Sequence, residues 1–140
     1  MSASNVASKW SSWAPQILSL LRIVLAFVFI TAGTTKMFGV PTAMPGGGTV
    51  PLWSQMWIGA LLEIVLGALV LVGLFTRPAA FVLAGEMAVA YFEFHFPTSF
   101  WPTVNQGMPA MLYSLVWLYF SAAGAGPWSL DALRERRRTV

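Results

Sequence analysis

The stretch LWSQMWIGALLEIVLGALVLVGLF, residues 52–75, decides the fold, because Glu63 is the only charged residue in it. A helix of this length, rising 1.5 Å per residue, is long enough to cross the roughly 30 Å hydrocarbon core of a bilayer. Three further apolar runs lie at residues 17–37, 78–95 and 107–124. Backbone groups in lipid must be hydrogen-bonded within the protein, and the alternating polarity of barrel strands is absent. We therefore predict an all-α integral membrane protein, a bundle of four helices.

The composition supports this prediction. Of the 140 residues, 57% are hydrophobic and 9% are charged, whereas roughly a quarter of the residues in an average soluble domain are charged. The predicted organisation is an amino-terminal cytoplasmic segment at 1–16, a four-helix domain at 17–124 and a basic cytoplasmic tail at 125–140. The four spans leave little chain for a soluble domain.

Positive charges in the flanks predict the orientation. Lys9, Arg77 and the four arginines among the last seven residues fall on one side of the predicted spans, whereas only Lys36 falls on the other. The positive-inside rule places the richer side in the cytoplasm. We expect an antiparallel bundle in the plasma (inner) membrane, multi-pass, with amino and carboxy termini cytoplasmic.

Several partners and cofactors are not expected. The chain has no cysteine and one histidine, so it offers no thiolate metal site, iron–sulfur cluster or bis-histidine haem site, and no metal is predicted. The net charge of +3 comes largely from the terminal arginines. Beside a membrane helix such a cluster favours binding to the anionic lipid of the bilayer, not to nucleic acid.

Five charged residues lie within or at the ends of the apolar runs, where each costs about 2.5–3.5 kcal/mol at a helix centre. Glu63 alternates with Gly59 and Gly67 at intervals of four, so its carboxylate should face another helix. By depth along the spans, we expect Arg22 to reach both Glu63 and Glu86. These three residues form the predicted intramembrane polar cluster, a candidate ligand-binding site, with simple interhelical contact as the alternative.

A second group of polar residues is expected near the outer surface. Lys36 and Glu93 come at similar depths and form a candidate pair, and His95 lies beside them as a proton relay, a ligand or a solvated side chain. On the inner side, Thr76 and Arg77 make a short turn, with Thr76 as the expected cap of the third helix.

The order and spacing of several short motifs resemble the DoxX family of small membrane proteins. The resemblance covers about residues 18–133. Its motifs are LLRI at 20–23, Gly33 through Lys36 to Gly39, LLEI at 61–64 and GLFTRPAA at 73–80. Further along the chain they are His95 before Pro97, NQG at 105–107, and Gly126 with WSLD at 128–131.

This resemblance implies a four-helix membrane protein, in a family associated with quinone-linked thiosulfate oxidation, a mycobacterial membrane oxidoreductase complex and resistance to oxidative stress. The polar positions typical of the family correspond to Arg22, Lys36, Glu63, Thr76, Arg77 and His95.

Three functions follow as hypotheses. The first is a membrane subunit or accessory of a quinone-linked oxidoreductase or redox-stress system, not catalytic alone, with a quinone or similar ligand between its helices. The second is a noncatalytic assembly partner or chaperone, whose small-residue stripes pack another membrane protein. The third is transport of a small solute or proton, which would require a homo-oligomer.

Overall fold

A computed structural model describes residues 8–138, and this part of the chain is helical without any strand. The helices are α2 (Ala14–Phe38), α3 (Gln55–Val72), α4 (Thr76–Ala90), the π-helical turn η1 (Tyr91–His95), α5 (Met108–Ala123) and α6 (Leu130–Arg138). The predicted all-α class is confirmed. The predicted terminal segments extend beyond the described residues at 1–7 and 139–140.

The second helix is shorter than its apolar run. Ser54 caps α3 by accepting a hydrogen bond from the Trp57 backbone N–H at 3.1 Å. Gly73 ends α3 in the left-handed conformation, with φ of +71°, which costs glycine little because it has no Cβ. The helix therefore occupies 55–72, inside the run predicted at 52–75.

The first helix is longer than its apolar run. It begins at Ala14 and not at residue 17, with Pro15 in its first turn, where a missing N–H costs no hydrogen bond. Gly39, with φ of +66°, ends it after Phe38.

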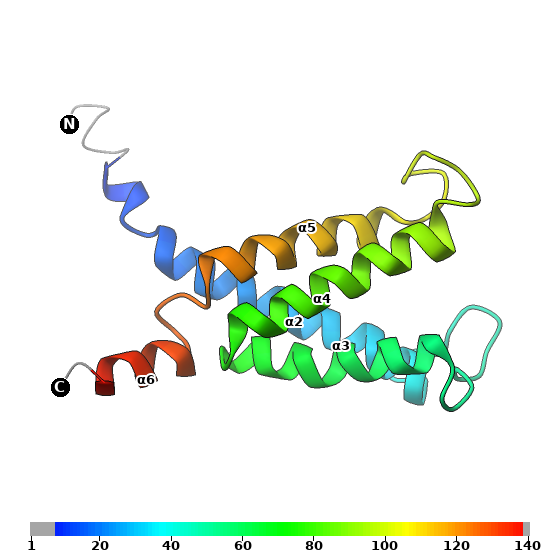
Figure 1. The fold of residues 1–140 in the computed structure, drawn as a ribbon, viewed down its shortest axis with the longest axis horizontal. Helices are drawn as coiled ribbons and strands as arrows, with labels where there is room; N and C mark the ends of the chain where they lie inside the picture. Colours follow the sequence, from blue (N-terminus) through cyan, green and yellow to red (C-terminus); the bar gives the residue numbers. More distant parts are fainter. Residues whose placement is uncertain (1–7, 139–140) are drawn as a thin grey trace.

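Two helix pairs build the core. α2 packs along α3, α4 packs along α5, and α3 joins the pairs by contacting α4 (Figure 1). At Gly33 the close contact between α2 and α3 leaves no room for a side chain, because an added Cβ would lie 2.7 Å from the Ala60 carbonyl oxygen. Phe29, Leu83, Trp117 and Phe120 fill the space between the pairs.

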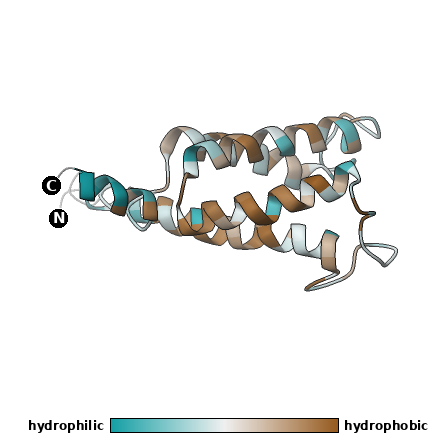
Figure 2. Ribbon diagram, turned by 60° about the horizontal axis from the view of Figure 1, so that its bottom comes forward, coloured by the Kyte–Doolittle hydropathy of each residue, from teal (hydrophilic) through white to brown (hydrophobic). Residues whose placement is uncertain are grey.

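The outer surface of the long helices is apolar. Phe27, Phe81 and Leu118 are each at least half exposed, and Figure 2 shows hydrophobic colour along the helices and hydrophilic colour on α6. Among the described residues, α2 and α3 are long and apolar enough to cross a membrane, whereas α5 is apolar but shorter. Such a surface suits lipid and not water.

The two ends of the molecule differ. The loops at 39–54 and 96–107 lie at one end, and the α3–α4 turn lies with α6 at the other (Figure 1). The basic tail predicted at 125–140 contains α6, which the sequence analysis did not anticipate. Ser129 starts this helix by accepting a hydrogen bond from the Ala132 N–H at 3.1 Å.

Candidate functional site

A partly buried ion pair joins α2 to α3. Lys36 Nζ lies 2.5 Å from Glu63 Oε1, and only 1% of the Glu63 side chain is exposed. Gly33 brings the two helices together one turn before Lys36, and an added Cβ there would lie 3.1 Å from Glu63 Cβ. The carboxylate faces protein, as its small-residue stripe predicted.

A second carboxylate faces the same cluster from α4. An added Cβ on Gly59 would lie 3.0 Å from Glu86 Oε1, so the small residue on α3 admits Glu86. Glu86 is close enough to Glu63 and Lys36 to interact with both electrostatically. The Oε2 atoms of Glu63 and Glu86 are buried and have no hydrogen-bond partner among the described residues. Two carboxyl groups therefore lie near one ammonium group, and one oxygen of each carboxyl accepts no hydrogen bond among the described residues.

The predicted pairing of Arg22 with these carboxylates is wrong. The guanidinium is fully buried, and it donates from Nε to the Ala125 carbonyl at 2.8 Å and from Nη1 to the Val70 and Leu71 carbonyls at 2.5 Å. Its Nη2 donates to the Trp128 carbonyl at 2.5 Å.

The level of Arg22 in the bundle accounts for this difference. Arg22 lies beside the last turn of α3, whose carbonyls have no intrahelical donors. Glu63 lies seven residues before Val70, which is about 10 Å along the helix.

The predicted outer pair of Lys36 with Glu93 is also replaced. Lys36 reaches inward to Glu63, while Glu93 accepts a hydrogen bond from Gln55 Nε2 of α3. His95 ends the π-helical turn, and its Nδ1 lies 3.0 Å from the Asn105 carbonyl oxygen. π-Turns are frequent at functional sites, and this one presents Glu93 near the start of α3.

A cavity of about 560 Å³ opens between α3 and α4 beside the carboxyls. Lys36, Gln55, Glu86 and His95 supply its polar groups. The remaining wall residues are mainly apolar, among them Met56, Ile58, Leu62, Phe81, Val82, Val89 and Phe94. We call this cavity the α3–α4 pocket. Its size and mainly apolar lining are typical of small-molecule sites.

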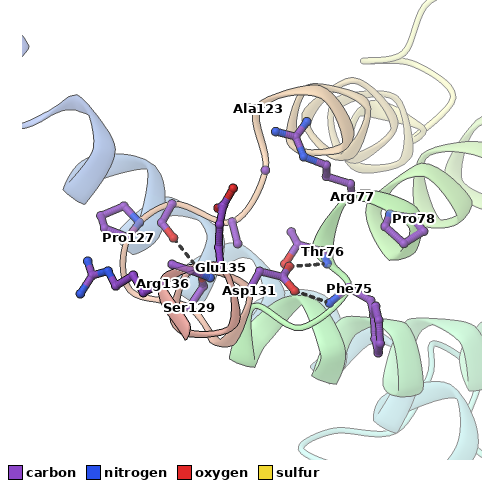
Figure 3. A pocket seen from close by; sticks show the side chains of 14 residues that line it. Phe75, Thr76, Arg77, Pro78, Ala123, Pro127, Ser129, Asp131, Glu135 and Arg136 are labelled. Atoms are coloured by element: carbon purple, nitrogen blue, oxygen red, sulfur yellow. Dashed lines mark hydrogen bonds between the residues drawn. The ribbon is translucent and has the colours of Figure 1, made fainter. Parts of the chain in front are cut away.

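The turn between α3 and α4 has a different cap from the one predicted. Asp131 of α6 accepts hydrogen bonds from the Phe75 and Thr76 N–H groups, both at 2.9 Å (Figure 3). Its own N–H donates to the Gly73 carbonyl at 2.8 Å. Thr76 is therefore not the cap of α4, and its Oγ1 is buried without a partner among the described residues. A carboxylate brought from elsewhere in the chain satisfies the helix start and its dipole.

Arg77 joins the turn to α5. Its Nη1 donates to the Ala122 carbonyl and, at 3.4 Å, to the Ser121 carbonyl. The C-terminal carbonyls of α5 thus have a cationic partner. Arg77 and Asp131 tie α4, α5 and α6 together at this end.

The sequence analysis missed three residues of these networks: Gln55, Asn105 and Asp131. Asn105 and Asp131 lie in motifs that carry the family resemblance, but only the fold shows what they contact. Gln55 had no sequence pattern that indicated its role.

The stripes of small residues on α4 and α5 pack against one another. Ala80, Ala84 and Ala110 are buried, and Ser114 Oγ of α5 donates to the Ala84 carbonyl of α4 at 3.0 Å. These contacts occupy surfaces that an assembly partner would need. The hypothesis of a chaperone that uses these stripes is weakened.

Buried charges between apolar helices, beneath a lipid-compatible surface, define a class of membrane-associated helical proteins. Residues 17–96, more than half of the chain, match the DoxX family, and the chain belongs to that family. An uncharacterized protein of Haemophilus influenzae is 43% identical over 122 residues, covering 85% of this chain and 91% of the relative. No solved structure matches the chain. The predicted family is confirmed.

Proposed function

We propose that α2, α3, α4 with η1, and α5 each cross the plasma membrane as an antiparallel four-helix bundle. α4 and η1 form 20 continuous residues, which correspond to about 30 Å. Lys9, Arg77 and the arginines of α6 would lie on the cytoplasmic side, and Lys36 towards the opposite side. The positive-inside rule then places both termini in the cytoplasm.

Cysteine labelling tests this topology directly, because the chain has no native cysteine. Single variants Thr49→Cys and Thr103→Cys report on the two outer loops, and Arg138→Cys reports on α6. An impermeant maleimide should label the two loop variants in intact cells and Arg138→Cys only after permeabilisation. Labelling of Arg138→Cys in intact cells would contradict the proposed orientation.

We further propose that the α3–α4 pocket binds a quinone or a similar apolar ring with polar oxygen substituents. The supporting observation is a cavity of ligand size whose apolar walls surround Lys36, Gln55 and Glu86. Lys36 and Gln55 carry N–H donors for carbonyl oxygens, and the Glu86 side chain lines the same cavity. A ligand that diffuses in the bilayer could enter between α3 and α4.

The proposed role is that of a membrane subunit or accessory in a quinone-linked oxidoreductase or redox-stress system. The described residues include no group of three or more His, Cys, Asp or Glu side chains suited to hold a metal ion. In this proposal the protein binds and positions the ligand, and a partner subunit carries out the electron transfer.

Binding of decylubiquinone to the purified protein in nanodiscs tests the ligand proposal. Gly85 lines the pocket, and an added Cβ there meets no atom within 4 Å. Gly85→Leu should therefore extend into the pocket without straining the helix. We expect it to weaken binding about tenfold or more, because a side chain replaces the ligand.

Ala68→Leu is the matched control. Ala68 is exposed on α3 and does not line the pocket, so the same bulk at this position should leave binding unchanged. Equal affinity of the Gly85→Leu variant and the unaltered protein would exclude this pocket as the binding site. Copurification of a defined oxidoreductase with the unaltered chain would support the accessory role.

A further inference from the structure

The four polar residues on the wall of the α3–α4 pocket differ in whether they already have partners. Lys36, Gln55 and His95 each lie within hydrogen-bonding distance of another residue. Glu86 does not, because its carboxyl has no hydrogen bond with any described residue. Among these four, Glu86 is therefore the residue whose hydrogen-bonding needs a ligand would meet.

One oxygen of the Glu86 carboxyl is placed to contact a ligand. Glu86 is partly exposed and lines the cavity from α4. Its Oε2 is buried, whereas its Oε1 lies beside Gly59, a wall residue of α3 whose added Cβ would be 3.0 Å away. We therefore take Oε1 as the oxygen that faces the ligand.

The protein itself supplies no donor to this oxygen. The nearby ammonium of Lys36 lies 2.5 Å from Glu63 Oε1 and forms its ion pair with that carboxylate. An acceptor without a donor in an apolar site costs about 1–3 kcal/mol. A ligand that brings a donor to Glu86 removes this cost, whereas a ligand that brings only acceptors does not.

The two redox forms of a quinone differ in this respect. A quinone has carbonyl oxygens, which only accept hydrogen bonds. Reduction by two electrons and two protons turns both carbonyls into hydroxyls, which donate as well as accept. The oxygens of either form can accept from the remaining N–H groups of Lys36 and Gln55, so these residues do not distinguish the forms. Glu86 does, because its oxygen attracts a hydroxyl and repels a carbonyl oxygen.

We propose that the α3–α4 pocket selects the reduced, hydroquinone form of its ligand, and that the Glu86 carboxyl accepts the hydrogen bond responsible for this preference. This inference rests on the ligand proposed above and adds the redox form that the pocket retains. Glu86 is then the residue that determines specificity, and the apolar wall holds the ring in either form.

Binding of decylubiquinone and decylubiquinol to the full chain in nanodiscs tests the proposal. The quinol is kept reduced under argon with dithionite, and the chain has no cysteine that the reductant could alter. We expect the quinol to bind about tenfold more tightly or better, the effect of one hydrogen bond to a charged group. Equal affinities, or tighter binding of the quinone, would overturn the proposal.

The dimethyl ether of decylubiquinol separates hydrogen bonding from the shape of the reduced ring. Both hydroxyls are methylated in this compound, so it keeps the aromatic ring but has no O–H donor. It should bind no more tightly than the quinone. An affinity equal to that of the quinol would assign the preference to ring shape and remove Glu86 from the explanation. This comparison uses the unaltered chain and does not depend on the folding of a variant.

Glu86→Gln locates the preference on the protein. The amide offers an N–H donor as well as an oxygen, so the affinities for quinone and quinol should come within about twofold of one another. The Lys36–Glu63 ion pair is retained, and a thermal unfolding midpoint checks the fold. A tenfold preference that survives in this folded variant would contradict the role of Glu86.

Glu93→Gln is the matched control, because it makes the same change two helical turns further along. Glu93 does not line the pocket, and the amide oxygen of the variant can still accept from Gln55. The preference for the quinol should remain about tenfold. Equal loss of preference in both variants would assign the effect to overall charge and not to Glu86.

Gly85→Leu distinguishes failure of this inference from failure of the proposed function. Equal binding of both redox forms, weakened equally by Gly85→Leu, would sink only the redox selectivity. Absence of binding of either form to the unaltered chain would sink the ligand proposal and the selectivity with it.

Discussion

Two cations on one face of α2, the buried Arg22 and the partly exposed Lys36, lie in contrasting surroundings. Arg22 donates to four carbonyl oxygens, two from the last turn of α3 and two from the linker to α6. Lys36 meets one carboxylate, Glu63, and leaves the Oε2 atoms of Glu63 and Glu86 without partners among the described residues.

This contrast indicates different roles for Arg22 and Lys36, although both are on α2. Buried polar groups are normally hydrogen-bonded, and a buried acceptor without a partner costs about 1–3 kcal/mol. The Arg22 network is well satisfied and joins chain segments, so we assign it a structural role. Lys36, Glu63 and Glu86 leave two acceptors without partners among the described residues, and Lys36 and Glu86 line a cavity, which supports the ligand proposal.

Arg22→Met should have the largest effect. It leaves four carbonyls without their cationic partner, and we expect the free energy of unfolding to fall by about 3 kcal/mol or more. Unfolding by denaturant in detergent micelles measures it. Arg138→Met, at the exposed end of α6, serves as the control and should leave the midpoint unchanged. A midpoint for Arg22→Met equal to that of the unaltered protein would show that the hydrogen bonds of Arg22 do not stabilise the fold.

Lys36→Met should have the next largest effect, because it leaves the Glu63 carboxylate buried without a cation. We expect a loss of about 1–3 kcal/mol. The double variant Lys36→Met/Glu63→Gln should recover part of that loss, since the amide carries no charge. A double-mutant cycle in the same unfolding assay measures the coupling, and strictly additive losses would show that the pair is not coupled.

Asp131→Asn should destabilise the contact between α4 and α6 by about 1 kcal/mol, because the start of α4 loses a charged cap. Release of α6 should also speed trypsin cleavage among its arginines. Limited proteolysis followed by mass spectrometry measures the rate. Glu135→Gln changes an acid on the same helix without touching the cap, so it should be cleaved at the original rate.

Thr76→Val should have the smallest effect on stability. The hydroxyl has no partner, so an isosteric apolar side chain should leave the free energy of unfolding unchanged or raise it by up to about 1 kcal/mol. Unfolding by denaturant in detergent micelles measures the change. A loss of more than about 1 kcal/mol would show that the hydroxyl is hydrogen-bonded in the folded protein.

Much of the helical organisation could be predicted from the sequence. Apolar runs located the long helices, and the four-residue spacing of Gly59, Glu63 and Gly67 predicted that the carboxylate faces protein. The helix ends were less accurate, because Pro15 allows α2 to begin early and Gly73 ends α3 before its apolar run is finished.

The pairing of charges could not be predicted from depth along each run. The sequence analysis chose Arg22 as the partner of Glu63, whereas the close contact at Gly33 brings Lys36 there. The capping role of Asp131 could likewise not be predicted from local sequence patterns, because Asp131 caps a helix that begins 55 residues earlier in the chain.

The amino-acid sequence by itself therefore determined which apolar segments are helical and which face of those helices carries polar residues, because both depend on the local periodicity of a helix. The tertiary structure alone decided which buried charge meets which partner. That choice depends on the relative level of neighbouring helices, which helix ends and close contacts at glycine set between segments far apart in the chain.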